Sequence, residues 1–207
     1  SAPYLEAIRQ MKWELGKNAV CVHLTYVPYL KAAGELKTKP TQHSVKELQS
    51  VGIQPDILVL RTEKHLGEGI LKKVASFCNV DIDCVVQSED LPSIYEVPVN
   101  MQNQGLDSAI LKKMGIEPGE KPALGPWKSF LERRAKATKE VNIGLVGKYD
   151  LQDAYKSIRE SLSQAGTYND YKTVMTFINS EKLTEENVAE KLKGMDGIVI
   201  CPGFGQR

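Results

Sequence analysis

The stretch "DILVLRT" (Asp56–Thr62) decides the fold, because it is a short and almost unbroken apolar run. Such a run predicts a strand buried on both faces of a sheet. "ILKKVASFC" (Ile70–Cys78) then predicts a helix, and "CVVQ" (Cys84–Gln87) predicts a third short strand. Strand, helix and strand of this length predict a right-handed parallel crossover. The chain therefore belongs to the α/β class.

The segment before this unit continues the alternation of helix and strand. Residues 3–16 predict an amphipathic helix, since their apolar side chains recur at helical spacing. "AVCVHLTYV" (Ala19–Val27) predicts a buried strand, and a helix up to about residue 50 follows. Thr41 or Ser44 is the expected N-cap of that helix, and Ser44 with Glu47 has the spacing of a capping box.

The segment after this unit leads to a domain edge. Helices are expected around Ile94–Gln102 and Ser108–Met114. "GIEPGEKPALGP" (Gly115–Pro126) then breaks the regular pattern with three prolines and three glycines. We therefore expect a first domain over residues 1–126, followed by a connecting helix and basic linker over residues 127–140.

A second α/β unit begins at "VNIGLVGKY" (Val141–Tyr149), which predicts a strand that runs into a glycine. Asp153–Gly166 predicts a helix that stops at its glycine, and Lys172–Ile178 predicts a strand. A helix that is capped by Thr184 and runs to about Met195 follows. A buried strand in Asp196–Arg207, which opens into a glycine-containing loop, completes the pattern. Three strands and one helical layer look unfinished, and no strand precedes the first helix. We expect this sequence to be a piece of a longer protein.

Composition excludes several classes of protein. Lysine plus arginine number 27 against 26 acidic residues, and this net charge of +1 argues against non-specific nucleic-acid binding. The sequence shows no leader and no apolar run long enough to cross a bilayer, so we expect a cytoplasmic protein without a membrane partner. The cysteines and histidines lack the short spacings of metal sites. Cysteines in apolar runs predict reduced thiols.

The segment "GELKTKPTQHSV" (Gly34–Val45) gathers cationic and hydrogen-bonding groups between two ordered elements. Lys37 and Lys39 flank Thr38, and Pro40 bends the chain into a helix start. Ammonium groups, hydroxyl groups and free helix N–H donors that converge can bind phosphates. The segment is not a glycine-rich Walker loop, and on pattern alone a solvated loop is the favoured interpretation.

Three further segments could bind ligands, and each has an ordinary alternative. The pair Lys72 and Lys73 is typical of a solvated helix face. "SED" (Ser88–Asp90) follows a strand end, where ligands bind in open parallel sheets, but on pattern alone a polar turn is favoured. "PGFG" (Pro202–Gly205) could offer backbone N–H groups to an oxyanion, although glycines that merely form turns are commoner.

Long segments of the chain closely resemble the CTP synthase family. The segment His23–Arg61, which contains "KTKPTQHSV", resembles the ligase domain of that family, as do the shorter motifs "FCNV", "SIYEVP" and "QGLD". "GLVGKYDLQDAYKSI" (Gly144–Ile158) and "PGFGQR" (Pro202–Arg207) look like the opening of the family's glutaminase domain. The resemblance covers essentially the whole chain, in order.

The resemblance implies a fold and an activity. The fold would be part of a parallel-sheet nucleotide-binding amidoligase domain over residues 1–126, then the first part of a class I glutamine amidotransferase α/β domain over residues 141–207. In the family, ATP phosphorylates the 4-oxygen of UTP, and ammonia released from glutamine displaces the phosphate to give CTP. The implied ligands are UTP, CTP, ATP, glutamine and Mg²⁺, with GTP as an allosteric activator. The family forms homotetramers that can stack into filaments.

The resemblance also implies roles for single residues. Glu89, Asp90 and Leu91 match the stretch beside the ATP adenine. Gly203 matches a glycine whose backbone binds glutamine and stabilises the oxyanion, although Cys201 and Pro202 depart from the Pro-Gly-Gly-Phe-Gly motif of many members. The implied UTP and CTP site comprises Lys37, Thr38, Lys39, Pro40, Thr41, Gln42 and, from the next helix, Lys73.

The family's P-loop, magnesium-binding acids, nucleophilic cysteine and His–Glu pair have no counterpart in this sequence. By resemblance they would lie outside it, so we expect no catalytic residue and no metal ligand here, and an inactive fragment. A non-catalytic CTP-sensing or assembly module of the same fold is an alternative. An unrelated nucleotide-binding domain would predict no glutaminase features after Val141.

Overall fold

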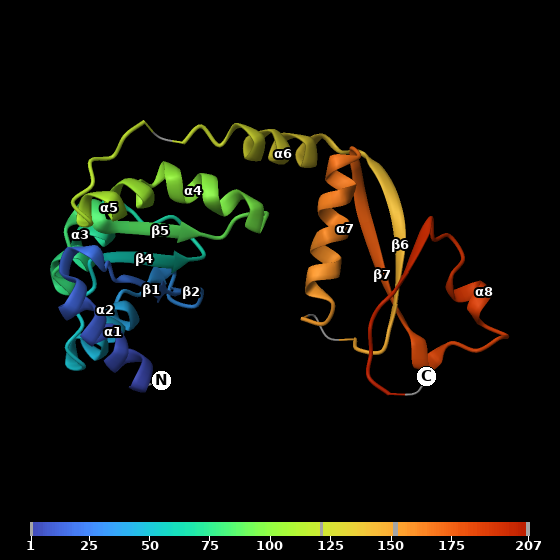
Figure 1. Ribbon diagram of the computed structural model, residues 1–207, viewed down its shortest axis with the longest axis horizontal. Coiled ribbons are helices and arrows are strands. Elements are labelled where there is room, and N and C mark those ends of the chain that lie inside the picture. Colours follow the sequence, from blue (N-terminus) through green and yellow to red (C-terminus); the bar gives the residue numbers. More distant parts are fainter. Residues whose placement is uncertain (1, 121, 151–152, 206–207) are drawn as a thin grey trace. The chain divides into compact units, whose positions relative to one another are not determined.

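The computed structural model describes residues 2–120, 122–150 and 153–205 and forms two compact units, Ser1–Ala123 and Leu124–Arg207. Each unit contains a three-stranded sheet in which all neighbouring strands are parallel (Figure 1). The predicted α/β class with parallel sheets is confirmed. None of the helices in the described residues combines the length and the apolar character that crossing a bilayer requires.

The first unit has the strand order β1-β4-β5, and a two-stranded hairpin, β2-β3, lies apart from this sheet. Short 3₁₀ turns precede β1, β5 and α4. Its elements are α1 (Ala2–Leu15), β1 (Val22–Val27), β2 (Tyr29–Leu30), β3 (Glu35–Leu36), α2 (Lys39–Ser50), β4 (Ile57–Thr62), α3 (Glu68–Cys78), β5 (Val85–Glu89), α4 (Val97–Asn103) and α5 (Leu106–Lys113).

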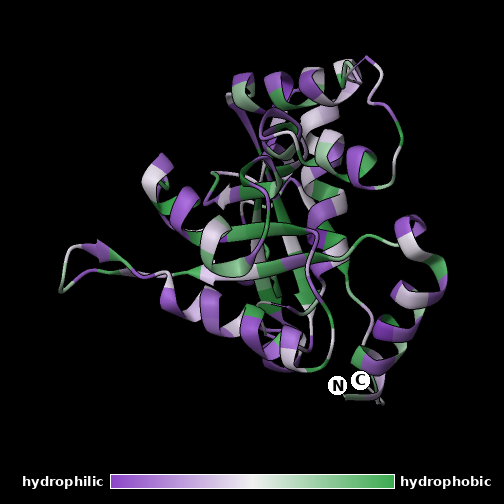
Figure 2. Cartoon of the chain, turned by 90° about the vertical axis from the view of Figure 1, so that its left-hand side faces the viewer, coloured by the Kyte–Doolittle hydropathy of each residue, from purple (hydrophilic) through white to green (hydrophobic). Residues whose placement is uncertain are grey.

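The central strand β4 organises the core of the first unit, as its apolar run predicted. Leu58 and Leu60 are fully buried among apolar side chains that include Val45 of α2 and Val74 of α3. The strands are mostly hydrophobic along their length, whereas the helices alternate hydrophobic and hydrophilic residues (Figure 2). This pattern is typical of helices that cover a sheet with one face and meet water with the other.

Strand β1 lies at the sheet edge, and the prediction that it is a buried strand is wrong for one of its faces. Leu24, Val59 and Val86 form one cross-strand row in the parallel register. Val86 is buried, whereas Leu24 is 65% exposed. The apolar sequence of β1 indicated the strand but could not show that its outer row lacks a cover within this chain.

The segment between β1 and α2 contains the β2-β3 hairpin, where the sequence predicted only a loop. The backbone N–H of Lys37 donates to the carbonyl of Pro28 at 2.9 Å next to this hairpin. Helix α2 has Thr38 as its N-cap residue, so the predicted N-caps at Thr41 or Ser44 and the capping box from Ser44 are wrong. Because the helix begins earlier, the Ser44 hydroxyl instead lies 3.0 Å from Nε2 of His23 on β1.

The second unit has the strand order β7-β6-β8. Helix α7 lies alongside β7, and α6 packs on α7 through Phe130 and Tyr168, whose ring centroids are 5.6 Å apart. Arg133 extends the same contact with a bidentate bond to Asp170. The elements are α6 (Gly125–Lys136), β6 (Lys139–Gly147), α7 (Lys156–Tyr168), β7 (Tyr171–Asn179), α8 (Val188–Lys191) and β8 (Gly197–Ile200).

Two predictions for the end of the second unit are wrong. The helix expected from Thr184 to Met195 is reduced to the four residues of α8, because Asn187 Oδ1 accepts the Thr184 backbone N–H and forms a turn there. The strand expected to be buried, β8, lies at the sheet edge, where Ile200 is 83% exposed. Gln206 and Arg207 of the predicted last loop lie outside the described residues, as do Leu151 and Gln152 of the Gly144–Ile158 motif.

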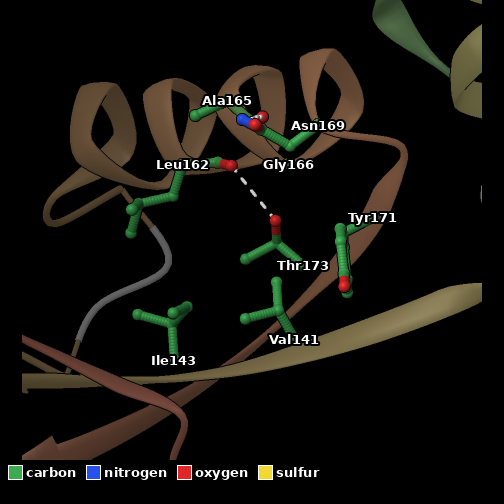
Figure 3. A pocket seen from close by; sticks show the side chains of 8 residues that line it. All are labelled: Val141, Ile143, Leu162, Ala165, Gly166, Asn169, Tyr171 and Thr173. Atoms are coloured by element: carbon green, nitrogen blue, oxygen red, sulfur yellow. Dashed lines mark hydrogen bonds between the residues drawn. The ribbon is translucent and has the colours of Figure 1, made fainter.

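Gly166 lies inside α7, so the prediction that it stops this helix is wrong. Its role is close packing: a Cβ atom at this position would lie 2.1 Å from Thr173 Oγ1 and 3.0 Å from the carbonyl oxygen of Tyr171. The Thr173 hydroxyl donates to the Leu162 carbonyl at 3.1 Å, which fixes β7 against the helix (Figure 3). A glycine allows α7 and β7 to approach this closely.

We expect Gly166→Ala to destabilise the second unit by about 1–3 kcal/mol, because the added methyl group must displace Thr173 or the backbone of Tyr171. Hydrogen exchange of α7 in the intact protein measures this loss. Gly69→Ala is the matched control, since Gly69 is also helical and a Cβ there meets no atom within 4 Å. In Gly69→Ala, the amide hydrogens of α3 should exchange as slowly as in the parent protein or more slowly. Unchanged exchange of α7 in Gly166→Ala would contradict the close packing.

A second prediction concerns His23, whose pKa is lowered from its usual value of 6.5 by burial. The unfolded chain therefore binds a proton more readily than the folded chain, so stability falls as the pH drops below about 6.5. Exchange of α2 amides should accelerate between about pH 7 and pH 5 beyond the intrinsic pH effect. His23→Gln should flatten this dependence, whereas His43→Gln, at an exposed position on α2, should retain it. The same pH dependence in His23→Gln would exclude this cause.

Candidate functional site

The predicted anion cradle, Lys37–Gln42, forms the junction between the β2-β3 hairpin and α2. Lys39 and Pro40 are exposed in the first turn of α2, where backbone N–H groups point out of the helix. Lys37 is half-buried and forms an ion pair with Glu35. The cradle therefore offers a helix N-terminus together with two lysine ammonium groups, one of them already paired with a carboxylate.

Two buried threonines fix this helix start. Thr41 is 0% exposed, and its hydroxyl donates to the carbonyl of Tyr26 at 3.0 Å and lies 3.1 Å from the Thr25 hydroxyl. Thr38 is also buried and accepts a hydrogen bond from Gln42 Nε2 at 3.3 Å. These hydroxyls are engaged inside the protein, so they hold the backbone that presents the lysines.

The two neighbouring lysines of α3, Lys72 and Lys73, have different surroundings. Lys72 forms an ion pair with Glu68 one turn earlier, at 2.6 Å, as a solvated helix face would. Lys73 is exposed on the same helix. Within the described residues, no hydrogen bond or ion pair joins Lys73 to the cradle, and its predicted reach to the same ligand stays a prediction.

The carboxyl ends of β4 and β5 carry the predicted segment Glu89–Leu91. Glu89 ends β5 and pairs with Thr62 in the register, and the Asp90 backbone N–H donates to the Thr62 carbonyl at 3.1 Å. The Asp90 carboxylate forms an ion pair with Arg61, and Glu89 lies 2.7 Å from His65 Nδ1. The structure thus brings two residues, Arg61 and His65, to a place where the sequence suggested no partners.

A signal for one of these residues was present in the sequence. Arg61 is the only charged residue in the apolar part of "DILVLRT", directly before the strand end. Ligands of open parallel sheets bind at the carboxyl ends of strands, so a cation at that place is a candidate contact. His65 follows in the loop after β4, and only the folded chain brings it to Glu89.

The second unit has a cavity of about 200 Å³ at the carboxyl ends of β6 and β8. Gly203 lies in its wall, so the structure places this predicted residue at a strand-end cavity. Burial raises the pKa of the Cys201 thiol, which keeps it protonated and poorly nucleophilic. The lining residues are Val146, Gly147, Lys148, Ser180, Ile200, Cys201, Gly203, Phe204 and Gly205.

A larger cavity of about 260 Å³ lies between α7 and the strands β6 and β7 (Figure 3). Val141 and Ile143 line it from β6, and Leu162 lines it from α7. The one bond drawn there, from Thr173 to the Leu162 carbonyl, is internal to the protein. Because few polar groups converge on it, this cavity is a weaker candidate for a polar ligand.

Among the described residues, the one group with donors close enough for a metal ion is Asp81, Asp83 and Cys84. Lys112 and Lys113 donate to Asp83 and Asp81, each at 2.8 Å. The bond from Lys112 lowers the pKa of Asp83, and burial raises the pKa of Cys84. Mg²⁺ requires several oxygen ligands, so a buried thiol and two lysine-paired carboxylates do not fit it.

Comparison with known proteins identifies relatives over the whole chain. A family model described as the CTP synthase N-terminus matches residues 1–116. The chain is 75% identical to the CTP synthase of Bacteroides thetaiotaomicron, 67% to that of Bacteroides fragilis and 63% to that of Porphyromonas gingivalis. Each match covers 100% of this chain and 39% of the relative.

The chain therefore spans well under half the length of the curated relatives that it matches. Residues 117–207 lie beyond the match to the family model but within the matches to these relatives. The family model covers more than half of the chain. On this evidence, and in agreement with the resemblance of its motifs, the chain belongs to the CTP synthase family.

Proposed function

We propose that the protein containing this chain converts UTP to CTP, with ATP as phosphoryl donor and glutamine as nitrogen source. The observation that carries the proposal is the cationic start of α2, Lys37–Gln42, in a chain of the CTP synthase family. ATP transfers a phosphoryl group to the 4-oxygen of UTP. Ammonia then forms the new C–N bond at C4 as phosphate leaves, and glutamine becomes glutamate.

In this proposal the cradle binds the pyrimidine nucleotide through its phosphates. A triphosphate carries several negative charges, which favour cationic donors and a helix N-terminus held in fixed positions. Lys39 and Lys37 supply the charge, and the first turn of α2 supplies backbone N–H groups. Thr38, Pro40, Thr41 and Gln42 shape this backbone, and Lys73 reaches the same ligand from α3.

The strand ends of the first unit form the ATP side of the proposed site. Glu89, Asp90 and Leu91 lie beside the adenine, where Arg61 and His65 already pair with the two carboxylates. These pairs orient the acidic side chains before the nucleotide binds. The magnesium ligands that ATP requires belong to parts of the protein outside this chain, and no described residue is assigned to the metal.

We assign residues 1–126 to the later part of the amidoligase domain, 127–140 to a connecting helix and linker, and 141–207 to the start of the glutaminase domain. The boundary between the two compact units after Ala123, close to the first of these divisions, and the cavity at Gly203 support the two-domain assignment. In the glutaminase role, the Gly203 backbone contacts glutamine and the oxyanion that forms at its carbonyl group. The nucleophilic cysteine belongs to a segment outside this chain.

The remaining features follow the resemblance to the family and complete the proposal. They are activation by GTP, a homotetramer that stacks into filaments, and a location in the cytoplasm. Free cysteines, three of them buried, support a reducing compartment. The alternative, a module that senses CTP or promotes assembly without catalysis, predicts nucleotide binding by the full-length protein without CTP formation.

The nucleotide site is tested by Lys39→Ala in the full-length protein. We expect the affinities for UTP and CTP to fall together by about tenfold to a hundredfold, the usual value of a charge-assisted hydrogen bond. Lys46→Ala is the matched control, because Lys46 is exposed on the same helix but away from its start. Calorimetry measures all three proteins. Equal affinities in Lys39→Ala and the parent protein would remove the cradle from the nucleotide site.

The glutaminase assignment is tested by Gly203→Val. A Cβ atom at Gly203 would meet Lys148 at an ordinary 3.6 Å, so the backbone there accepts a Cβ, and the rest of the valine side chain adds bulk beside the cavity. We expect glutamine-dependent CTP formation to fall about a hundredfold or more, as when an oxyanion donor is lost. Synthesis from supplied ammonia should continue at the parent rate. An equal loss with both nitrogen sources would show a purely structural role for this loop.

A further inference from the structure

The loop Pro202–Gly205 is tied to the end of β6 by two hydrogen bonds to a single residue. Lys148 Nζ donates to the carbonyl oxygen of Phe204 at 2.8 Å. The backbone N–H of Phe204 donates to the Tyr149 hydroxyl at 3.2 Å. The Phe204 side chain is 83% exposed, so its backbone, and not its ring, is the part that the protein holds.

Tyr155 contacts both residues that hold Phe204, through the backbone of Lys148 and the ring of Tyr149. Its hydroxyl accepts the backbone N–H of Lys148 at 3.1 Å, and its ring lies 6.2 Å from the ring of Tyr149. A Cβ atom on Gly147 would lie 2.7 Å from the Tyr155 ring, so the strand end needs a glycine there. The Tyr155 backbone is left-handed, with φ at 58°, which is rare for such a bulky residue.

This arrangement fixes the peptide units that follow Gly203. The Gly203–Phe204 peptide is oriented through its N–H group, and the next peptide is oriented through its carbonyl group. The Gly203 N–H has no acceptor within the described residues, and Gly203 lines the cavity. A free N–H on a backbone that is fixed on one side is suited to donate to a developing anion.

The Lys148 side chain is not explained by an ordinary surface ion pair. In the described part of the chain, no carboxylate lies within ion-pair distance of its ammonium group, whose hydrogen-bond acceptor is the neutral Phe204 carbonyl. Other lysines of the second unit, such as Lys172 with Glu140, do form surface pairs. Lys148 thus uses a charged group to orient a loop at the cavity.

We propose that Lys148 and Tyr149 are positioning residues that set the Gly203–Phe204 backbone in the orientation that glutamine hydrolysis requires. The inference rests on the proposed glutaminase function of the second unit. Both residues act through the loop, and Tyr155 supports them through the Lys148 backbone and the Tyr149 ring. Neither touches the reacting atoms in this account, so their loss should lower turnover of glutamine without affecting the use of free ammonia.

The test uses Lys148→Met and Tyr149→Phe in the full-length protein. We expect kcat/KM for glutamine, measured by glutamate release and by CTP formation, to fall about tenfold in each, the upper range for one hydrogen bond. Ammonia-dependent CTP formation should stay at the parent rate. Lys148→Arg, which keeps a cationic donor, should recover part of the loss.

Matched controls make the same chemical changes elsewhere in the second unit. Lys172→Met removes a lysine from a surface pair, and Tyr171→Phe removes an exposed tyrosine hydroxyl. Both should retain the parent kinetics. Hydrogen exchange gives a readout that needs no activity: the Phe204 amide should exchange faster in Tyr149→Phe than in Tyr171→Phe, because it has lost its acceptor.

The outcomes separate the two proposals. Unchanged glutamine kinetics in Lys148→Met and Tyr149→Phe, with an active parent enzyme, would overturn the positioning role alone. An equal fall with glutamine and with ammonia would also overturn it, since the residues would then only support the fold. A parent protein that releases no glutamate and makes CTP only from ammonia would overturn the glutaminase function itself, and the positioning role with it.

Discussion

Leu58 and Leu60 of β4 lose all contact with water between the sheet and helices α2 and α3, and the first unit is arranged around that burial. Each such side chain contributes about 1.5–3 kcal/mol. Because β4 pairs in parallel with both of its neighbours, the carboxyl ends of β1, β4 and β5 lie on the same side of the sheet. The ion pairs of Arg61 and His65 with residues at the end of β5 follow from this alignment.

In the second unit, the arrangement depends on glycines that allow neighbouring elements to pack closely. Gly166 lets α7 lie against Thr173 of β7, and Gly147 leaves room for the Tyr155 ring at the end of β6. A side chain at either glycine would push the helix or the tyrosine away. Gly147 also lines the cavity beside Gly203, whereas Gly166 lines the cavity between α7 and the strands.

The sequence predicted elements whose pattern is strong and whose surroundings lie within the chain. The apolar run of β4 is the example, because sequence pattern and burial point to the same element. The helical spacing of α1 also indicated a helix, but none of its residues, Ala2–Leu15, is buried within this chain. The sequence could not predict the exposure of Leu24 or Ile200, because that exposure depends on which strands form the edges of the sheets. Gly166 was taken as a helix stop because a glycine near a helix end is ambiguous until its neighbour is known.

In the candidate sites, too, the sequence indicated some residues and could not indicate others. Motifs placed Lys39 and Gly203 at a helix start and a strand end, where the structure has them. The residues that hold these backbones, such as Tyr149 and Tyr155, act through contacts across the fold that no local pattern reveals. For Thr41 the sequence suggested a cap or a ligand contact, and the structure shows a hydroxyl bound to the Tyr26 carbonyl.

That buried hydroxyl has a consequence for the thermodynamics of recognition. Because Thr41 joins the start of α2 to β1, the first turn is already ordered before any anion arrives. A ligand that binds there spends little of its interaction energy on restricting the backbone, and the lysine side chains carry most of the remaining entropic cost. Affinity at this helix start should then depend on side-chain charge and solvent, with little contribution from folding of the loop.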